Sequence, residues 1–436
     1  MTRILVLSRS VVGPKMASPG VRAYQIAGAL ARAMPEADVT LGYPDDHEPV
    51  APPHPGVRMV SYGSNAEALF LAGQSDVTIS RNFPPQFARL LGKTRLALDG
   101  FTPLYVEWME LSKRDILPKW RRTWVASNRW YLNMQLTLAD FIFCADERQR
   151  DLWIGMMMAL ALVPSDVYER DPSLRKIIDV VPYGVSQRPL DAIERPLRGA
   201  VDGINIGDRV ILWNGGITEW NDIDTLLHAM ARIARRRPEV KLVFMGVDHP
   251  DLVFGPNTGV ARHAVELTRE LGLENRNVFF RSGWVPYERI DDYLAEADLS
   301  VCLGYENLES RFAFRTRYVD LFRARVPLLC TRGDVLAERV EREPLGITVP
   351  ERDIEAVERG VERLLDDVAF NDVCKANMRL VAEELSWDRV VQPLVDFCRR
   401  DETFAMAPGR RRLQAYGRGG MYFALKTFCQ SPPLHD

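Results

Sequence analysis

Cysteine and histidine are scarce in this sequence, and neither residue is clustered. The six cysteines form no C-x-x-C pair, and three of them lie in short apolar runs typical of strands: Cys144, Cys302, Cys330, Cys374, Cys398 and Cys429. We therefore expect reduced core residues of a cytosolic protein. The six histidines lack metal-ligand spacing, and no DxD-type acidic pair follows a strand end. We expect neither a built-in metal site nor a bound cofactor.

Long hydrophobic runs and a charge excess are also missing. No stretch reaches about 18 apolar residues, the length that a membrane-spanning helix needs. The chain does not open with a charged segment followed by an apolar one, so we expect a cytoplasmic protein without a signal peptide. The net charge of −3, with 26% charged and 47% hydrophobic residues, gives no indication of a nucleic-acid partner.

The chain is too long for one hydrophobic core, since 436 residues correspond to two domains of about 200 residues each. Apolar runs alternate with amphipathic segments throughout, which predicts an α/β fold with two Rossmann-like domains facing each other across a cleft. The boundary is predicted in residues 186–208, where Pro, Gly and Arg interrupt the periodicity, so that the domains span residues 1–195 and 205–385. The expected strands are residues 3–7, 38–41, 57–61, 76–79, 95–98, 140–144 and 180–185, then 209–213, 241–246, 278–283, 299–303 and 327–330.

The stretch from residue 298 to 334 is the most informative. A strand at 299–303, a loop at 304–313, a helix and a strand at 327–330 predict one βαβ unit, whose ligands lie beyond the carboxyl ends of the strands. Arg315 and Arg317 fall in the first turn of the helix, where cations oppose the helix dipole unless an anion compensates them. They are therefore interpreted as phosphate-facing. The alternative is that Arg317 and Arg323 pair with Asp320 on a solvated helix face.

The first half offers weaker candidates, namely Gly20 for contact with a donor phosphate or sugar, and Arg22, Asp99 and Glu107 for an acceptor site. Gly20 closes a Gly-bearing loop after the first strand, which lets backbone approach a phosphate or sugar or merely starts a helix. Arg22 follows it in the helix. Asp99 and Glu107 bracket a loop at a strand end, although Asp99 could simply cap the following turn.

The segment Glu110–Leu138 is rich in Trp, Arg and Lys. Aromatic bodies with basic flanks can lie in a bilayer interface or hold a lipid-linked acceptor, which would make the chain a peripheral protein of the inner membrane face. The more frequent meaning is the solvated face of a long helix. The three-arginine run of the tail, residues 401–436, is too short to specify a partner.

The order of these motifs resembles glycosyltransferase family 4. The resemblance rests on VVPYGV, VILWNGGITEWNDIDTLLHA, VFFRSGWVPYERIDDYLAEADLSVCL, FRTRYVDLFRARVPLLCTRGD and a late Ser-Trp dipeptide, and it covers nearly the whole chain except the tail. It implies a GT-B fold and a retaining, metal-independent transfer of a sugar from a nucleoside diphosphate sugar to an acceptor hydroxyl. It also implies a helix at residues 386–400 that crosses back to the first domain.

The resemblance assigns roles to residues of the second half. Asp320 stands where the family has the acidic residue that binds the nucleotide ribose. Gly215 and Gly216 match the phosphate-proximal turn, and Gly283 and Trp284 lie in the segment whose backbone receives the nucleobase.

Two departures from the family pattern stand out. The family's Arg and Lys after the first glycine loop are replaced by Ile217, Thr218 and the residues that follow, so Arg315 and Arg317 are expected to supply the positive charge. The family's first acidic residue is replaced by Phe312, for which Glu306 or, preferably, Glu309 is expected to substitute. A pseudo-glycosyltransferase, a sugar-nucleotide epimerase and a silent binding protein of the same fold stay as alternatives.

Overall fold

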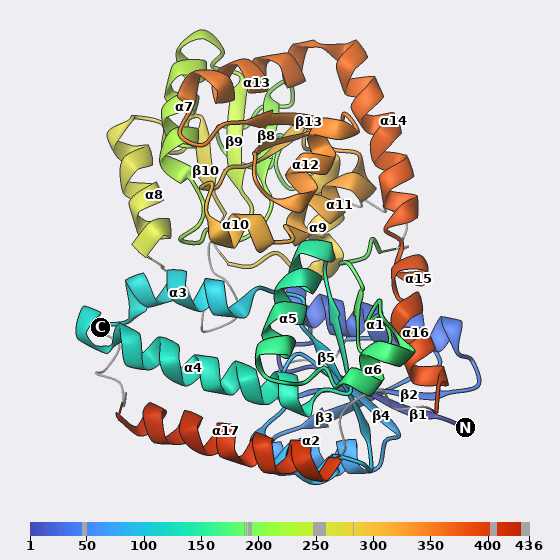
Figure 1. Cartoon of the computed structure of the whole chain (residues 1–436). Helices are drawn as coiled ribbons and strands as arrows, with labels where there is room; N and C mark the ends of the chain where they lie inside the picture. Colours follow the sequence, from blue (N-terminus) through green and yellow to red (C-terminus); the bar gives the residue numbers. More distant parts are fainter. Residues whose placement is uncertain are drawn as a thin grey trace. The chain divides into compact units, whose positions relative to one another are not determined.

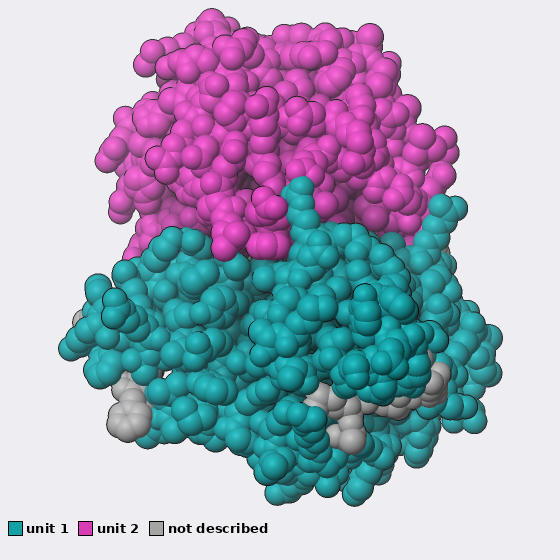
Figure 2. Space-filling model, viewed as in Figure 1, with its two compact units in different colours: residues 1–12, 19–182, 387–436 teal, residues 13–18, 183–386 magenta. Residues whose placement is uncertain are grey.

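The structure is a computed structural model that describes residues 1–45, 50–186, 188, 190, 194–246, 259–281, 283–401 and 408–428 (Figure 1). The chain forms two compact units, coloured separately in Figure 2. Unit 1 comprises Met1–Val12, Pro19–Pro182 and Trp387–Asp436, and unit 2 comprises Gly13–Ser18 and Tyr183–Ser386. Each unit carries its own parallel sheet, which confirms the predicted α/β class.

Unit 1 is built on a seven-stranded sheet in the order β3-β2-β1-β4-β5-β6-β7. Its strands read as nearly continuous apolar runs because helices cover both faces of a parallel sheet. The prediction of a strand at residues 180–185 is wrong, since β7 already ends at Val180 and Pro182 has no N–H to continue the ladder. The strands are β1 (Arg3–Leu7), β2 (Asp38–Pro44), β3 (Val57–Tyr62), β4 (Val77–Ser80), β5 (Arg95–Asp99), β6 (Phe141–Cys144) and β7 (Ile178–Val180).

Two expected helices of unit 1 are each divided in the structure, and the helix Pro408–Phe428 in the tail was not predicted. The Trp- and Arg-rich segment is two helices, because the chain breaks at Ile116 and Leu117 and Pro118 starts the second. The helix expected at 386–400 is likewise two short helices. The helices are α1 (Ser18–Ala33), α2 (Asn65–Gly73), η1 (Pro85–Leu90), α3 (Leu104–Asp115), α4 (Pro118–Leu138), α5 (Glu147–Ala159), α6 (Ser165–Arg170), α15 (Trp387–Val390), α16 (Gln392–Arg399) and α17 (Pro408–Phe428).

The last segment of the chain is an integral part of unit 1. The guanidinium of Arg95, at the start of β5, donates to the carbonyl oxygens of Phe397 (2.9 Å) and Cys398 (3.0 Å) at the end of α16. The helix α17 packs lengthwise against α4, and Ala415 of α17 joins the core of the unit. The helix α17 therefore completes a core that also contains Leu5 and Leu7 of β1.

Unit 2 has a six-stranded sheet in the order β10-β9-β8-β11-β12-β13. With β8 counted as the first strand, this is the doubly wound order 3-2-1-4-5-6, which reverses direction between β8 and β11. The edge strand β13 has no counterpart in the prediction. The strands are β8 (Arg209–Trp213), β9 (Val240–Phe244), β10 (Val278–Phe280), β11 (Leu299–Cys302), β12 (Leu328–Thr331) and β13 (Gly346–Val349).

The helices of unit 2 include one inside the predicted loop 304–313. This helix, α10 (Leu308–Phe312), has five residues and begins at Asn307, whose side chain accepts a hydrogen bond from the Ser310 N–H. It is too short to show a helical period in the sequence. The others are α7 (Ile223–Arg236), α8 (Gly259–Glu270), η3 (Tyr287–Arg289), α9 (Ile290–Ala295), α11 (Thr316–Ala324), α12 (Val335–Arg342), α13 (Ile354–Asp366) and α14 (Val368–Glu384).

Candidate functional site

The candidate site lies in unit 2, where the strand order reverses between β8 and β11. The loops that follow these two strands are joined by backbone hydrogen bonds, from Asp222 N to Leu303 O (3.1 Å) and from Tyr305 N to Trp220 O (3.2 Å). A side chain at Gly304 would place its Cβ 2.9 Å from the Trp220 carbonyl oxygen, so only glycine fits between the loops. Crevices at such reversal points are where doubly wound sheets bind ligands.

The loop after β8 carries the two predicted glycines, Gly215 and Gly216. Gly215 has a φ of 133°, a backbone conformation that favours glycine. Asn214, just before it, is fixed by the Ser300 hydroxyl (3.1 Å to its Oδ1) and donates to the Arg317 carbonyl (2.9 Å). The loop is therefore tied both to β11 and to the start of α11.

Arg317 brings a positive charge to this glycine loop. Its guanidinium lies 5.2 Å from the centre of the Trp213 ring, and Nη2 donates to the Gly216 carbonyl (3.1 Å). Nη1 is buried and has no hydrogen-bond partner among the described residues. The N-terminus of α11 also has no side-chain cap. A cation with an unused donor, beside an uncapped helix start, is suited to bind an anion.

Arg315 has a different environment from Arg317. Its guanidinium makes a two-pronged ion pair with Glu309 (2.8 and 3.0 Å) and also donates to the Ser310 hydroxyl (3.1 Å). Burial lowers the pKa of Arg315, but the Glu309 charge outweighs this, and the pKa is raised overall. Because Glu309 is 1% exposed, this pair is buried and nearly neutral. Arg315 and Glu309 were predicted to act on a ligand separately, whereas in the structure they pair with each other.

A small cavity beside the pair extends to the start of α12 and is lined by Asn221, Gly304, Ser310, Arg315, Tyr318 and Asp334, among others. Asp334 caps α12 by accepting from the N–H groups of Leu336 and Ala337 (2.9 and 2.8 Å). Burial raises the pKa of Asp334 to about 6, against the opposing effect of the Arg315 charge. A proton therefore sits on this carboxyl over part of the range below neutral pH.

Asp320 lies one turn after Arg317 in α11. The neighbouring cation Arg323 pairs with the buried Asp291 of α9, which also binds Arg188 (2.9 Å). Neither Arg317 nor Arg323 therefore forms the predicted surface pair with Asp320. Burial raises the pKa of Asp320, and the charge of Arg323 opposes this rise.

Gly283 and Trp284 follow β10 and so lie at the same edge of the sheet as the glycine loop. Gly283 has a φ of 79°. Trp284 packs on Gly246 at the end of β9, where an added Cβ would lie 3.2 Å from the indole ring. An aromatic ring at this edge could stack on a flat ligand group. The neighbouring Ser282 is outside the described residues.

In unit 1 the structure pairs two of the predicted acceptor-site residues with each other. Arg22 donates to Asp99 (2.8 Å) and to the carbonyl oxygens of Val181 and Pro182, and its guanidinium lies over the Phe101 ring. Arg22 is 1% and Asp99 7% exposed, so this pair is part of the core. Asp99 does not cap a turn, which corrects that alternative as well.

Gly20 is buried in the first turn of α1. Glu107 lies in the first turn of α3 and is partly exposed. Among the described residues, no three His, Cys, Asp or Glu side chains are grouped as metal ligands would be. The same part of the chain contains no helix with the length and apolarity to cross a bilayer.

Comparisons with known proteins show what this part of the chain is similar to. Residues 208–367 match the family model of glycosyl transferases group 1. These residues lie within unit 2, so the similarity to that family concerns unit 2. An uncharacterized glycosyltransferase of Methanocaldococcus jannaschii is 26% identical over 197 residues, which are 44% of this chain and 45% of that protein. The match thus spans less than half of the relative's length.

Solved structures resemble the chain over nearly its whole length. Sucrose-phosphate synthase from Thermosynechococcus elongatus superposes with a TM-score of 0.63 at 17% identity, covering 92% of this chain and 98% of that one. Anabaena HepE in complex with UDP and glucose gives a TM-score of 0.61 at 14% identity, covering 91% and 99%. At these identities the likeness establishes the fold, which is GT-B.

Two features of this site were not predicted from the sequence. Trp213 supports the Arg317 guanidinium, and Asn214 couples the glycine loop to α11. Trp213 and Asn214 come just before Gly215 at the end of β8, and this position could have marked them as site residues. Their contacts with Arg317 could not be predicted, because Arg317 is more than 100 residues away in the sequence.

Proposed function

We propose that this chain is a retaining, metal-independent glycosyltransferase of family 4, a hexosyltransferase that moves a sugar from a nucleoside diphosphate sugar to an acceptor hydroxyl. The match of residues 208–367 to the group 1 family model and the GT-B fold support this assignment. So does the Anabaena protein of the same fold, which has been solved with UDP-glucose. The donor is a substrate, and the proposal requires no resident cofactor.

The observation that carries the proposal is the buried, unpartnered Nη1 of Arg317 beside Gly215 and Gly216. A departing diphosphate needs its negative charge neutralised, and a fixed guanidinium provides this without reorganising at the moment of reaction. In this scheme Gly215 and Gly216 let the phosphates approach the backbone, and Asp320 accepts from the ribose hydroxyls. Trp284 lies beside the nucleobase.

The proposed reaction needs no protein nucleophile. The bond between the anomeric carbon and the diphosphate oxygen breaks while the acceptor oxygen bonds to the same face of the sugar. The acceptor proton passes to the leaving phosphate oxygen. Arg317 stabilises the charge on the diphosphate, and exclusion of water prevents hydrolysis of the sugar.

The pairing of Arg315 with Glu309 changes the role proposed for both. Because each neutralises the other, the pair contributes little net charge to the diphosphate. We assign it to positioning, since it fixes the connection between α10 and α11 and thereby the start of the helix that carries Arg317. The Glu309 carboxylate is paired with Arg315, so in this scheme it does not act on the ligand.

Arg317→Gln tests the proposal, because glutamine keeps most of the side-chain length and removes the charge. We expect transfer or donor hydrolysis, assayed with UDP-, GDP- and dTDP-sugars, to fall roughly a hundredfold. Arg317→Lys should recover part of this loss, since lysine restores the charge but not the forked geometry. Arg311→Ala, at an exposed position of α10, is the matched control. Unchanged turnover and donor affinity in Arg317→Gln would refute the assignment.

The same assay separates the alternatives that share this fold. The loop after Gly216 supplies no cation, because Ile217 is buried and Thr218 binds Asn221 (2.8 Å), which keeps an epimerase or a pseudo-glycosyltransferase open. An isomerised donor would indicate the epimerase, and transfer to a cyclitol the pseudo-glycosyltransferase. Binding without turnover would indicate a silent protein.

A further inference from the structure

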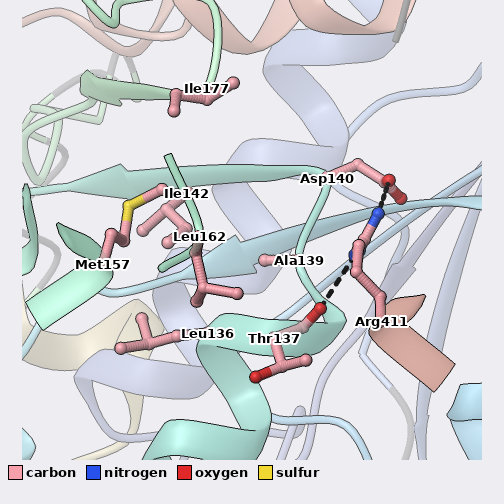
Figure 3. Close-up of a pocket in the computed structure, with 9 residues that line it drawn as sticks. All are labelled: Leu136, Thr137, Ala139, Asp140, Ile142, Met157, Leu162, Ile177 and Arg411. Carbon is pink, nitrogen blue, oxygen red and sulfur yellow. Dashed lines mark hydrogen bonds and ion pairs between the residues drawn. The ribbon is translucent and has the colours of Figure 1, made fainter. Parts of the chain in front are cut away.

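The C-terminal helix α17 is fixed to unit 1 along one face. Arg411, which is 2% exposed, pairs with Asp140 and donates to the carbonyl oxygen of Thr137 (2.9 Å), as Figure 3 shows. Two turns further on, Gly419 approaches α4 so closely that an added Cβ would lie 3.2 Å from the Met134 sulfur. These contacts fix which face of α17 points away from the core of unit 1.

That outward face is apolar. Leu413 is 77%, Tyr416 46%, Met421 44% and Phe423 52% exposed. Four of the sixteen large hydrophobic side chains that are exposed among the described residues thus lie on this one helix of 21 residues. Such a concentration on a firmly attached helix indicates a surface that contacts a partner.

The charge pattern identifies the kind of partner. The helices α4 and α17 together contain nine Lys and Arg residues and no Asp or Glu, whereas the whole chain has 56 basic and 59 acidic residues. Lys119, Arg122 and Arg129 of α4 and Arg410 and Lys426 of α17 are exposed. Trp120, also exposed, lies beside Lys119, whose ammonium is 5.7 Å from the ring centre. Neither helix carries an acidic side chain that would offset these exposed cations.

We propose that α17, together with the basic start of α4, binds the surface of an anionic lipid bilayer and lies in the plane of the interface. Apolar side chains on one helix face with Lys and Arg beside them are what such binding requires, because the apolar groups enter the acyl boundary while the cations meet anionic headgroups. A symmetric contact between two copies would place cations against cations. A nucleic acid backbone would offer no apolar surface for Leu413 and Met421 to contact.

The experiment uses the full chain and two kinds of vesicle, phosphatidylcholine alone and an equal mixture of phosphatidylcholine and phosphatidylglycerol. Flotation should recover the protein with the anionic vesicles, with little on the neutral ones, and 0.5 M NaCl should weaken binding. Leu413→Ser/Phe423→Ser should lower the partition coefficient roughly tenfold, because two interfacial apolar groups are lost. Lys119→Glu/Arg122→Glu should weaken binding to anionic vesicles by a similar factor.

Leu380→Ser is the matched control, since Leu380 is 55% exposed on α14 of unit 2, outside the proposed surface, and should leave binding unchanged. An unchanged melting temperature of each variant shows that the fold is intact. Absence of binding to the anionic vesicles would overturn the proposal, as would an equal loss in Leu380→Ser. So would a dimer that Leu413→Ser/Phe423→Ser dissociates, or tighter binding to duplex RNA than to vesicles.

Discussion

Glu309→Ala is expected to destabilise unit 2 strongly because it leaves Arg315 buried without its counter-ion. Removing one partner of a buried ion pair costs about 3–5 kcal/mol. The lower end applies here, since the Arg315 side chain keeps 13% of its surface exposed and retains the Ser310 hydroxyl and the nearby Asp334 carboxyl. We therefore expect a loss of about 3 kcal/mol in the free energy of unfolding.

Urea unfolding followed by tryptophan fluorescence measures this loss. Glu274→Ala is the matched control, because its ion pair with Arg269 is on the surface and should leave the unfolding midpoint unchanged. The double variant Glu309→Ala/Arg315→Ala should be more stable than the sum of the two single losses predicts, because it leaves no buried charge unpaired. A Glu309→Ala midpoint as close to wild type as that of Glu274→Ala would refute the reasoning and return Glu309 to a ligand-facing role.

Two further outcomes follow from buried carboxyl groups. The pKa of Asp334 is about 6 in the folded chain and ordinarily 3.8, so the folded state holds more protons between these values and stability contributed by this group falls as pH rises from about 4 to 6. Asp334→Asn, which preserves the helix cap, should flatten the pH dependence of the melting temperature in this window; an unchanged slope would contradict the assignment. Asp99→Ala should lower the melting temperature by several degrees because it leaves the buried Arg22 without its counter-ion. A binding role for Asp99 alone would instead weaken acceptor affinity at unchanged stability.

The sequence predicted the elements with strong local signals. The strands β1, β11 and β12 were predicted within one residue of their observed ends, since each is a short, largely apolar run. The five-residue α10 was missed because its signal is a single cap, Asn307. The strand β13 was missed because its four residues, beginning with glycine, form only a weak apolar run.

The site was predicted less completely than the fold. The helix start that carries Arg315 and Arg317 was found from the dipole argument, but the pattern could not distinguish the two arginines. Their difference arises from Glu309, which α10 turns toward Arg315, and from Trp213, which lies under Arg317. The Arg22–Asp99 pair joins residues 77 positions apart, and no local pattern records such a contact.

The divided sequence of unit 1 has a consequence for synthesis on the ribosome. Arg95 emerges 302 and 303 residues before its partners Phe397 and Cys398, and Asp140 emerges 271 residues before its partner Arg411. The sheet of unit 2, residues 209–349, is complete well before that point. Nascent unit 1 therefore lacks these partners of Arg95 and Asp140 until residues 387 and beyond are made, whereas the residues of unit 2 are all translated before that point.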